Sequence, residues 1–414
     1  MKNERRFSRE LDELYRDREK LDSANEYIDN IVESLRSGHD EQKIRNNLGK
    51  GPIMFEGAIE VARSRLSVSG KFTKWNRLWL DSYSASYSTP EIVGLYRAGR
   101  LQSSNMVDVG CGAGMQSVFF SKTCSVTSIE VSALRATMTK LNGSVYGHSP
   151  DRVINADYAN VIENLKVDEE TVIFSDPLRP KTESERSLPS LIPSPLVLRK
   201  LLSGKTEKFV FDLPPQISWD NLTLEGEKEY ISIGGSLNRL TLYQGDLGHS
   251  ESSAVILPWN VRIRGKPSPS DFMKAGRVGR YLYVPDISLQ YARLLNGVKQ
   301  LGEFSLLVKD RRRFVLTSDN ELEWMFPGEA FEVLDTVNES ELTGTLKERN
   351  CRNAIIRFSV DPEEYYTIRR DMETDLTGEV DLYIFRVDGR YIVCSKIEEN
   401  LDKPMQTDVM SHVG

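Results

Sequence analysis

The 414-residue sequence has no run of about 18 apolar residues, the length that a membrane-spanning helix requires. Its N-terminal segment, MKNERRFSRELDELYRDREK, is charged throughout and lacks the apolar core of a secretory signal peptide. We therefore expect a cytoplasmic protein without a membrane segment.

Cysteine and histidine are both scarce, with four residues of each. No two cysteines form a CxxC pair, so the sequence does not support a disulfide framework or a zinc site. The histidines are isolated from one another, and a metal-dependent mechanism has little support. We expect no bound metal.

Neither sign of charge dominates the sequence. Lysine and arginine number 54 and aspartate and glutamate number 61, which gives a formal net charge of −7. This balance does not suit a protein that coats nucleic acid non-specifically, although it leaves room for a local basic face that binds one folded RNA. The length predicts two or three domains.

Residues 1–85 are expected to form an N-terminal helical region. The segment Ser23–Glu26 fits a capping box at the start of the second helix, and a further helix is expected over residues 53–68. We interpret the region as a packing or lid subdomain, because its mixed charge does not favour RNA binding. Apolar residues with the three- and four-residue spacing of a helix face are Phe7, Leu11, Leu14, Tyr27, Ile28, Ile31, Val32 and Leu35.

Between residues 86 and 264, short apolar runs alternate with longer mixed segments. This order predicts strands alternating with helices, as in a Rossmann-like α/β domain whose parallel sheet is covered on both faces. Helices are expected at residues 132–142 and 194–203. The expected strands lie at residues 106–109, 125–129, 171–174, 209–211, 229–233, 238–243 and 254–257.

Residues 265–400 are expected to form a second domain of the α+β class. Its clearest element is a hairpin in which Asp388-Gly389 joins alternating apolar runs at residues 381–387 and 390–397. Asp-Gly between such runs is a strong hairpin signal. The polar residues 401–414 are expected to form a disordered tail.

The most informative segment is residues 107–114 (VDVGCGAG), where an expected strand ends in a Gly-x-Gly-x-Gly turn before a helix. Glycine permits the sharp turn and lets a ligand touch the backbone where a Cβ would collide. Asp108, at the strand end, is expected to meet a cationic amino or sulfonium group. The predicted ligand contacts in this segment are Asp108, Gly110, Cys111, Gly112, Ala113 and Gly114.

Two acidic residues follow the next strands. Glu130 suits the two hydroxyl groups of a ribose, and Asp157 suits the exocyclic amine of adenine, with Tyr158 flanking the ring. The turn alone would also fit an ordinary strand–helix connection, and a nicotinamide dinucleotide is the main rival ligand. Its fingerprint is Gly-x-Gly-x-x-Gly, whereas here the third glycine comes one position earlier, which favours S-adenosylmethionine as the cofactor.

Asp176 and Pro177 follow the strand expected at residues 171–174. Ligands of open α/β sheets bind beyond the carboxyl ends of the strands, so Asp176 is expected beside the glycine-rich turn. Pro177 stiffens the backbone. Asp176 is then positioned to accept a hydrogen bond from an amine and orient it for in-line attack on a sulfonium methyl group. The alternative interpretation is a helix N-cap followed by proline.

From about residue 75 onward the chain resembles the class I methyltransferases that carry a C-terminal THUMP-like domain. The resemblance implies that Arg179 joins Asp176 and Pro177 as a catalytic residue. Two departures from the family pattern, Pro180 and residues 213–216 (LPPQ), imply a different substrate choice. The segments that carry the resemblance are residues 88–97 (STPEIVGLYR), 108–114 (DVGCGAG), 176–180 (DPLRP) and, most specifically, 279–286 (GRYLYVPD).

Related THUMP-bearing enzymes modify tRNA or rRNA, so the resemblance implies an RNA substrate, and a guanosine base of tRNA is our expectation. Cations in the second half of the chain would neutralise phosphates, although solvated surface is the commoner fate of such clusters. Two alternatives stay open, a methyltransferase of small molecules or proteins and a non-catalytic module that binds S-adenosylmethionine. The predicted RNA contacts are Arg277, Arg280, Lys309, Arg311, Arg312 and Arg313.

Overall fold

The computed structural model describes residues 2–101, 103–178, 188–310, 313–323 and 325–398. Arg179, Arg311, Arg312 and the predicted tail lie outside these residues.

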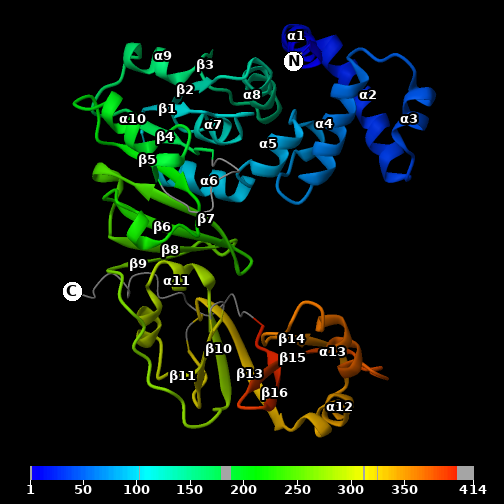
Figure 1. Cartoon of the computed structure of the whole chain (residues 1–414), viewed down its shortest axis with the longest axis vertical. Coiled ribbons are helices and arrows are strands. Elements are labelled where there is room, and N and C mark those ends of the chain that lie inside the picture. Colours follow the sequence, from blue (N-terminus) through cyan, green and yellow to red (C-terminus); the bar gives the residue numbers. More distant parts are fainter. Residues whose placement is uncertain (1, 102, 179–187, 311–312, 324, 399–414) are drawn as a thin grey trace. The chain divides into compact units, whose positions relative to one another are not determined.

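The chain forms two compact units (Figure 1). The first comprises Met1–Lys228 and Arg239–His249, and the second comprises Glu229–Asn238 and Ser250–Gly414. The boundary predicted between residues 264 and 265 lies inside strand β9 (Val261–Gly265) of the second unit, and the predicted domain limits stay a prediction.

The first unit begins with five helices, and the apolar stripes predicted for the first two are buried in it, except that Leu35 is half-buried. The capping box expected at Ser23–Glu26 is wrong, because these residues lie inside a helix that begins earlier. Asp17 caps that helix by accepting a hydrogen bond from the N–H of Lys20 at 3.1 Å. The five helices are α1 (Lys2–Arg16), α2 (Arg18–Arg36), α3 (Glu41–Leu48), α4 (Phe55–Ser67) and α5 (Ser82–Tyr87).

A largely parallel sheet follows, with helices between its strands. Its neighbours pair in parallel from β3 to β5, and β7 is antiparallel to β5. In sheet order the strands are β3 (Arg152–Asn155), β2 (Ser125–Glu130), β1 (Asn105–Val109), β4 (Val172–Ser175), β5 (Phe209–Leu213) and β7 (Ser236–Tyr243). The helices are α6 (Glu91–Arg100), α7 (Met115–Phe120), α8 (Ala133–Tyr146), α9 (Tyr158–Val161) and α10 (Pro195–Leu201). This arrangement confirms the Rossmann-like α/β fold that the alternation of strands and helices predicts.

The N-terminal helices and the sheet share one hydrophobic core. It runs from Phe7 and Ile28 in the helices to Phe120 and Phe174 beside the sheet. The last two rings meet edge to face, with centroids 5.1 Å apart. Every residue of β4 and β5 is buried, as expected for strands covered on both faces. The N-terminal region is therefore an integral part of the first unit.

The second unit combines two groups of strands. In the first group, β8 (Ser252–Leu257) pairs antiparallel with β9, and β6 (Glu227–Ile233) ends at a Gly234-Gly235 turn. The second group is a seven-stranded sheet in the order β11 (Ser305–Lys309), β12 (Phe314–Ser318), β10 (Tyr281–Pro285), β13 (Gly328–Val337), β16 (Arg390–Lys396), β15 (Val380–Val387) and β14 (Cys351–Ile356). Its helices are α11 (Ile287–Tyr291), α12 (Glu339–Glu348) and α13 (Tyr365–Met372).

The predicted hairpin of this unit is confirmed. Strands β15 and β16 pair antiparallel up to Val387 and Arg390. Asp388 and Gly389 both have positive φ, 48° and 81°, which is the backbone that a two-residue type I′ turn requires. The turn residues therefore set the register of these two strands.

Among the described helices, none combines the length and the apolar character needed to cross a membrane. Within the described residues, no group of three or more His, Cys, Asp or Glu side chains is placed to hold a metal ion. The four cysteines are free thiols, of which Cys351 and Cys394 are buried.

Candidate functional site

The carboxyl ends of neighbouring strands bring the predicted residues of the first unit to one edge of the sheet. Val109 at the end of β1 pairs with Ile129, directly before Glu130 at the end of β2. Ser175, at the end of β4, pairs with Phe211 of β5, so Asp176 and Asp212 follow at the same level. The glycine-rich turn, Glu130 and Asp176 thus share the edge at which ligands of open α/β sheets bind.

The glycines of the turn meet different structural requirements. Gly110, Gly112 and Gly114 all have positive φ, at 79°, 59° and 78°. A Cβ added at Gly112 would have no atom within 4 Å, whereas one at Gly114 would meet Cγ2 of Thr139 at 2.3 Å. Gly112 therefore leaves open space beside the backbone, and Gly114 lets helix α8 pack against the turn.

Two side chains of α8, which sequence reasoning missed, donate hydrogen bonds to carbonyl groups of the turn. The hydroxyl of Thr139 donates to the carbonyl of Gly112 at 3.0 Å. The amide of Asn142 donates to the carbonyl of Ala113 at 2.9 Å and to that of Trp79 at 3.0 Å. Their only signal in the sequence is that they are polar residues on the apolar face of a predicted helix.

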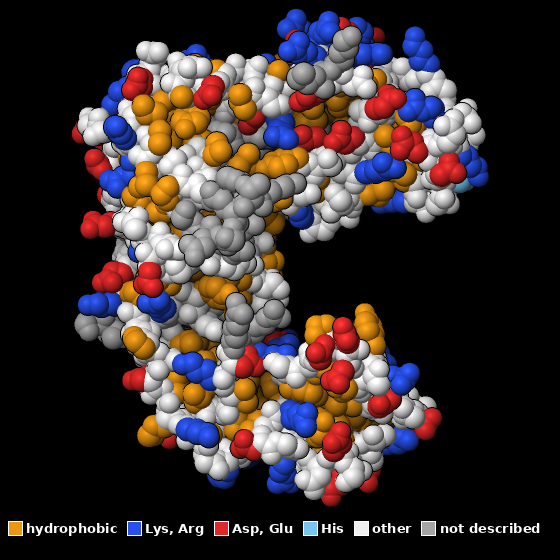
Figure 2. Space-filling model, viewed as in Figure 1, with side chains coloured by type: hydrophobic (Ala, Val, Ile, Leu, Met, Phe, Trp, Pro, Cys, Tyr) orange, Lys and Arg blue, Asp and Glu red, His pale blue; other side chains and the backbone are white. Residues whose placement is uncertain are grey.

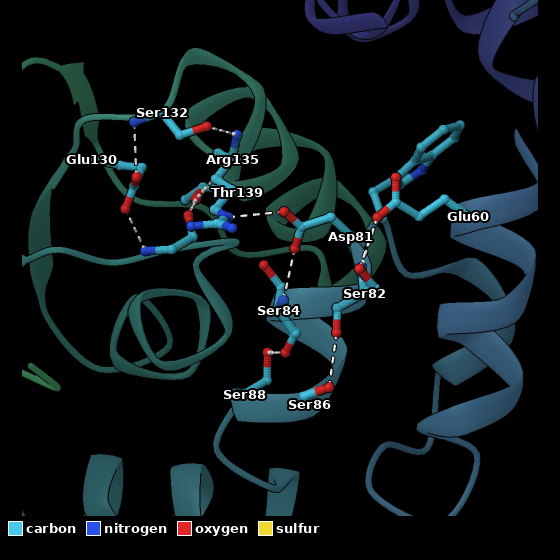
Figure 3. A network of polar contacts seen from close by, with 12 residues as sticks. Glu60, Asp81, Ser82, Ser84, Ser86, Ser88, Glu130, Ser132, Arg135 and Thr139 are labelled. Carbon is cyan, nitrogen blue, oxygen red and sulfur yellow. Dashed lines mark hydrogen bonds and ion pairs between the residues drawn. The ribbon is translucent and has the colours of Figure 1, made fainter. Parts of the chain in front are cut away.

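The Glu130 carboxylate is held in a defined orientation by backbone amides (Figure 3). Oε2 accepts the N–H of Gly112 at 2.9 Å, and Oε1 accepts the N–H of Ser132 at 2.8 Å. The residue is only 6% exposed. A carboxylate has about four acceptor positions, of which these two amides use two, and the predicted contact of Glu130 with a ribose stays a prediction.

An ion pair ties the N-terminal helices to this part of the site (Figure 3). Nε of Arg135, at the start of α8, donates to Oδ2 of Asp81 at 2.9 Å. The other oxygen of Asp81 accepts the N–H of Ser84 and caps α5, and the next residue, Ser82, binds Glu60 of α4. This chain of contacts connects α4 and α5 with Arg135, which lies shortly after Glu130 in the sequence. It was not predicted.

Asp108 is 1% exposed, and its carboxyl group accepts a hydrogen bond from the hydroxyl of Ser117 on α7. Ser117 in turn accepts the hydroxyl of Ser128 at 2.8 Å. Burial raises the pKa of Asp108 to about 7. The structure therefore places this side chain between β1 and α7, and its direct contact with a ligand stays a prediction.

Asp157 and Tyr158 lie where β3 ends, next to Glu130 in the sheet register. Asp157 is exposed and caps the short helix α9 by accepting the N–H of Ala159 at 3.0 Å. Tyr158 is half-buried, and burial raises the pKa of its hydroxyl group. Their predicted contacts with an adenine ring stay a prediction.

Asp176 lies directly after β4, and its side chain is 40% exposed. The surrounding protein desolvates its carboxyl group and raises the pKa to about 6, with Arg239 acting in the opposite direction and Asp212 in the same one. The guanidinium of Arg239 lies 3.9 Å from Oδ2 of Asp176. The next residue, Pro177, is buried and restricts the backbone beside Asp176. The raised pKa brings the Asp176 carboxyl group closer to neutral pH than an ordinary aspartate.

Three further charged residues, all missed by sequence reasoning, are connected to Asp176 by a chain of ion pairs. Nη2 of Arg97 donates to both carboxylate oxygens of Asp212, at 2.6 and 2.7 Å. Nε of Arg239 lies 3.7 Å from Asp212 and so bridges Asp212 and Asp176. The chain of alternating charges is assembled from α6, β5 and β7, which are far apart in the sequence.

Helix α5 carries two tyrosines, of which Tyr83 lies within the electrostatic influence of Asp176. The rings of Tyr83 and Tyr87 have centroids 4.6 Å apart. The backbone carbonyl of Tyr87 accepts a hydrogen bond from Arg239 at 3.1 Å. Tyr87 is 55% exposed, whereas Trp79 is 1% exposed and packs in the core. Tyr87 thus presents an exposed ring, and its backbone binds the arginine that lies next to Asp176.

The predicted RNA contacts belong to the second unit and have varied surroundings. Arg277 forms an exposed ion pair with Asp319, Arg280 is exposed, and the Lys309 ammonium contacts the hydroxyl of Ser270 at 3.3 Å. Arg313 lines a pocket of this unit. On the face drawn in Figure 2, basic and acidic side chains of the second unit are interspersed. RNA binding by these residues stays a prediction.

Comparison with known proteins agrees with this geometry. Residues 103–181, which contain the glycine-rich turn, Glu130 and Asp176, match the family model described as RNA cap guanine-N2 methyltransferase. The chain is 32% identical over 109 residues to the trimethylguanosine synthase of Schizosaccharomyces pombe (strain 972 / ATCC 24843). This match covers 24% of the chain and 45% of the relative, so the chain spans less than half of the relative's length.

The fold extends this likeness to nearly the whole chain. A crystal structure from Porphyromonas gingivalis W83, described as a methyltransferase, matches with a TM-score of 0.69 and 15% sequence identity. The match covers 92% of this chain and 99% of that one. At this identity the likeness shows a shared fold, and residues 103–181 resemble the family model described as RNA cap guanine-N2 methyltransferase.

Proposed function

We propose that the protein transfers a methyl group from S-adenosylmethionine to the exocyclic amine of a guanosine in RNA, with cytoplasmic tRNA as the substrate. The observation that carries the proposal is the juxtaposition of the open glycine turn, the oriented Glu130 and the poised Asp176 at one sheet edge. In this proposal the glycine turn contacts the cofactor, Glu130 binds the ribose of the cofactor, and Asp176 accepts a hydrogen bond from the reacting amine.

The residues of the turn fit the cofactor. The space beside Gly112 is what a Cβ would fill and what a ligand backbone contact requires. Glu130 retains acceptor positions for the ribose hydroxyl groups, while its orientation is set by Gly112 and Ser132. Asp157, after the next strand end, is exposed on the same edge, and in this proposal it accepts a hydrogen bond from the adenine amine.

When bound, S-adenosylmethionine supplies a methyl group on a positively charged sulfur. Asp176 accepts a hydrogen bond from the guanine amine and takes up the proton that the nitrogen must lose, because its raised pKa of about 6 suits proton transfer near neutral pH. Tyr87 provides a stacking face for the base, and Pro177 restrains the acid. The residues thus act mainly by alignment, which is the chief requirement of such a transfer.

Three observations support RNA as the substrate. The matched family model is described as acting on cap guanine N2, and the relative is a trimethylguanosine synthase. The resemblance of residues 279–286 to enzymes with THUMP-like domains supports tRNA or rRNA rather than a cap. The second unit would then carry the RNA, with Arg277, Arg280, Lys309 and Arg313 among its contacts.

Nucleoside mass spectrometry tests the proposal directly. We would incubate the full chain with tRNA that lacks modification and with methyl-labelled S-adenosylmethionine, and then digest the RNA. Label in N2-methylguanosine is the expected result, and the Asp176→Asn variant should give far less. Label in another nucleoside would correct the target. No label in any RNA, despite cofactor binding, would favour a non-catalytic module, and label in protein or small molecules would favour the other alternative.

A further inference from the structure

Helix α5 is fixed at both of its ends by contacts with residues of the candidate site. Directly before the helix, Asp81 accepts a hydrogen bond from Arg135 at 2.9 Å (Figure 3). At its last residue, the carbonyl of Tyr87 accepts a hydrogen bond from Arg239, whose guanidinium lies 3.9 Å from Asp176. All of these residues belong to the first unit. The six-residue helix, about 9 Å long, therefore connects the start of α8 with the surroundings of the proposed acid.

Tyr83 of this helix is held by contacts with its aromatic ring. It precedes Tyr87 by one helical turn, so the two side chains share a face of α5. Their ring centroids are 4.6 Å apart and their planes are inclined by 38°. Cζ of Arg135 lies 4.4 Å from the centroid of the Tyr83 ring. The ring is thus fixed in place, whereas the proposed function leaves its hydroxyl group without a role.

The hydroxyl group of Tyr83 is available to a ligand. Within the described residues it forms no hydrogen bond, although the side chain is half-buried. Burial raises the pKa of this hydroxyl group, Arg135 lowers it, and Asp176 acts in the same direction as burial. Tyrosine hydroxyl groups that are partly removed from water usually have a partner, and a phenol both donates and accepts hydrogen bonds.

A flat base needs more than one polar contact to be aligned for methyl transfer. An ionised carboxylate such as that of Asp176 only accepts hydrogen bonds, and it would bind the amine alone. Stacking on an aromatic ring fixes the plane of a base but leaves it free to rotate in that plane. The ring nitrogens beside the amine of guanine donate or accept hydrogen bonds, and proteins bind such base edges in single-stranded RNA. A second polar contact at that edge would stop the rotation.

We propose that Tyr83 positions the acceptor base, with its hydroxyl group bound to the ring edge next to the amine that Asp176 holds. This inference rests on the function proposed above and adds one residue to it. Tyr87 then supports the face of the base, and Tyr83 sets its rotation in the plane. Alignment of the reacting atoms governs the rate of such a transfer, so the contact should affect turnover more than binding.

The Tyr83→Phe variant tests the role of the hydroxyl group, because it keeps the ring and its contacts with Arg135 and Tyr87. With tRNA that lacks modification, kcat should fall about tenfold, while KM for tRNA and the affinity for S-adenosylmethionine stay unchanged. The matched control is Tyr15→Phe in the same unit. Tyr15 is 43% exposed and its ring lies 5.8 Å from the ammonium of Lys140, and the control should keep the kcat of the unaltered protein.

Fluorine NMR of the full chain labelled with 3-fluorotyrosine measures the contact without turnover. The Phe variants of Tyr83, Tyr87 and Tyr15 assign the three signals. The protein is first saturated with S-adenosylhomocysteine, and tRNA that lacks modification is then added. The signals of Tyr83 and Tyr87 should shift, and the signal of Tyr15 should stay in place.

Three results would overturn the role of Tyr83. They are full kcat in Tyr83→Phe, a Tyr83 signal that does not respond to tRNA, or a loss of S-adenosylmethionine affinity that matches the loss of kcat and so assigns the residue to the cofactor. If the Tyr83 signal shifts while no RNA accepts a methyl group, the contact with RNA stands and the proposed function fails. If RNA is methylated at guanosine while Tyr83→Phe keeps full kcat, the proposed function stands without Tyr83.

Discussion

Arg97 and Asp212 form a fully buried ion pair in which one guanidinium nitrogen meets both carboxylate oxygens, at 2.6 and 2.7 Å. Their side chains are 0% and 1% exposed. Gln116 accepts a further hydrogen bond from Arg97 at 2.5 Å, and Thr241 donates to Asp212 at 2.8 Å. Asp212 also faces Arg239, which faces Asp176. A fully buried ion pair is thus connected to the proposed acid through Arg239.

Asp212→Asn should lower the free energy of unfolding by about 3–5 kcal/mol, because it leaves the Arg97 charge buried without its counter-ion. Urea denaturation monitored by circular dichroism measures the loss. The matched control is Asp319→Asn, which breaks the exposed pair with Arg277 and should cost less than about 1 kcal/mol. Equal losses of unfolding free energy in the two variants would show that the buried pair contributes no more to stability than the exposed pair.

The pH dependence of methyl transfer should report Asp176. Its carboxyl group accepts a proton only when ionised, so the rate should rise with pH around a midpoint near the pKa of about 6. Asp176→Asn should abolish this midpoint and lower turnover by roughly 100-fold or more, with little change in cofactor affinity. Rates under saturating substrates between pH 5 and 8 provide the measurement.

Arg239→Gln should move the same midpoint to higher pH, since the Arg239 charge lowers the pKa of Asp176. Arg63→Gln serves as the control, because Arg63 pairs with Glu41 on the N-terminal helices. A midpoint that is unchanged by Arg239→Gln, or a variant Asp176→Asn with full activity, would remove Asp176 from the mechanism.

Gly112→Ala should weaken S-adenosylmethionine binding while leaving the fold largely intact. The added methyl group would project into the open space of the turn, and positive φ would cost about 1–2 kcal/mol of stability. Gly147→Ala is a matched control, because Gly147 also has positive φ and open space but ends α8. Gly114→Ala should unfold most easily, since its methyl group collides with Thr139. Calorimetric binding and thermal unfolding of the three variants distinguish a ligand effect from backbone strain.

Asp108→Asn should change how stability depends on pH. Burial raises the pKa of Asp108 to about 7 from an ordinary value near 3.8. The native state therefore binds the proton more tightly, and the contribution of this group to stability is lost as the pH rises from about 4 to 7. The variant should gain on the unaltered protein by at most about 1.4 kcal/mol per pH unit over that range. Denaturation of both proteins at several pH values measures the difference, and a constant difference would contradict the buried acid.

Local signals in the sequence were sufficient where short-range sterics decide the structure. Asp388-Gly389 predicted its hairpin, because both residues must adopt positive φ in a tight turn. The capping box expected at Ser23–Glu26 was wrong because short-range interactions alone do not decide where this helix begins. Asp17 fits an N-cap equally well, and the choice between them depends on where α1 ends and packs.

Residues close together in the chain were enough to predict the strand–helix alternation, the glycine turn, and the acids that follow successive strands. The ion pairs that connect Arg97, Asp212 and Arg239 with Asp176, and Asp81 with Arg135, could be seen only in the folded chain. The pocket that Arg313 lines in the second unit is likewise built from segments between residues 234 and 396. Residues this far apart in the sequence meet only when the whole unit packs. Burial then strengthens the electrostatic interactions between their charges, which composition cannot indicate.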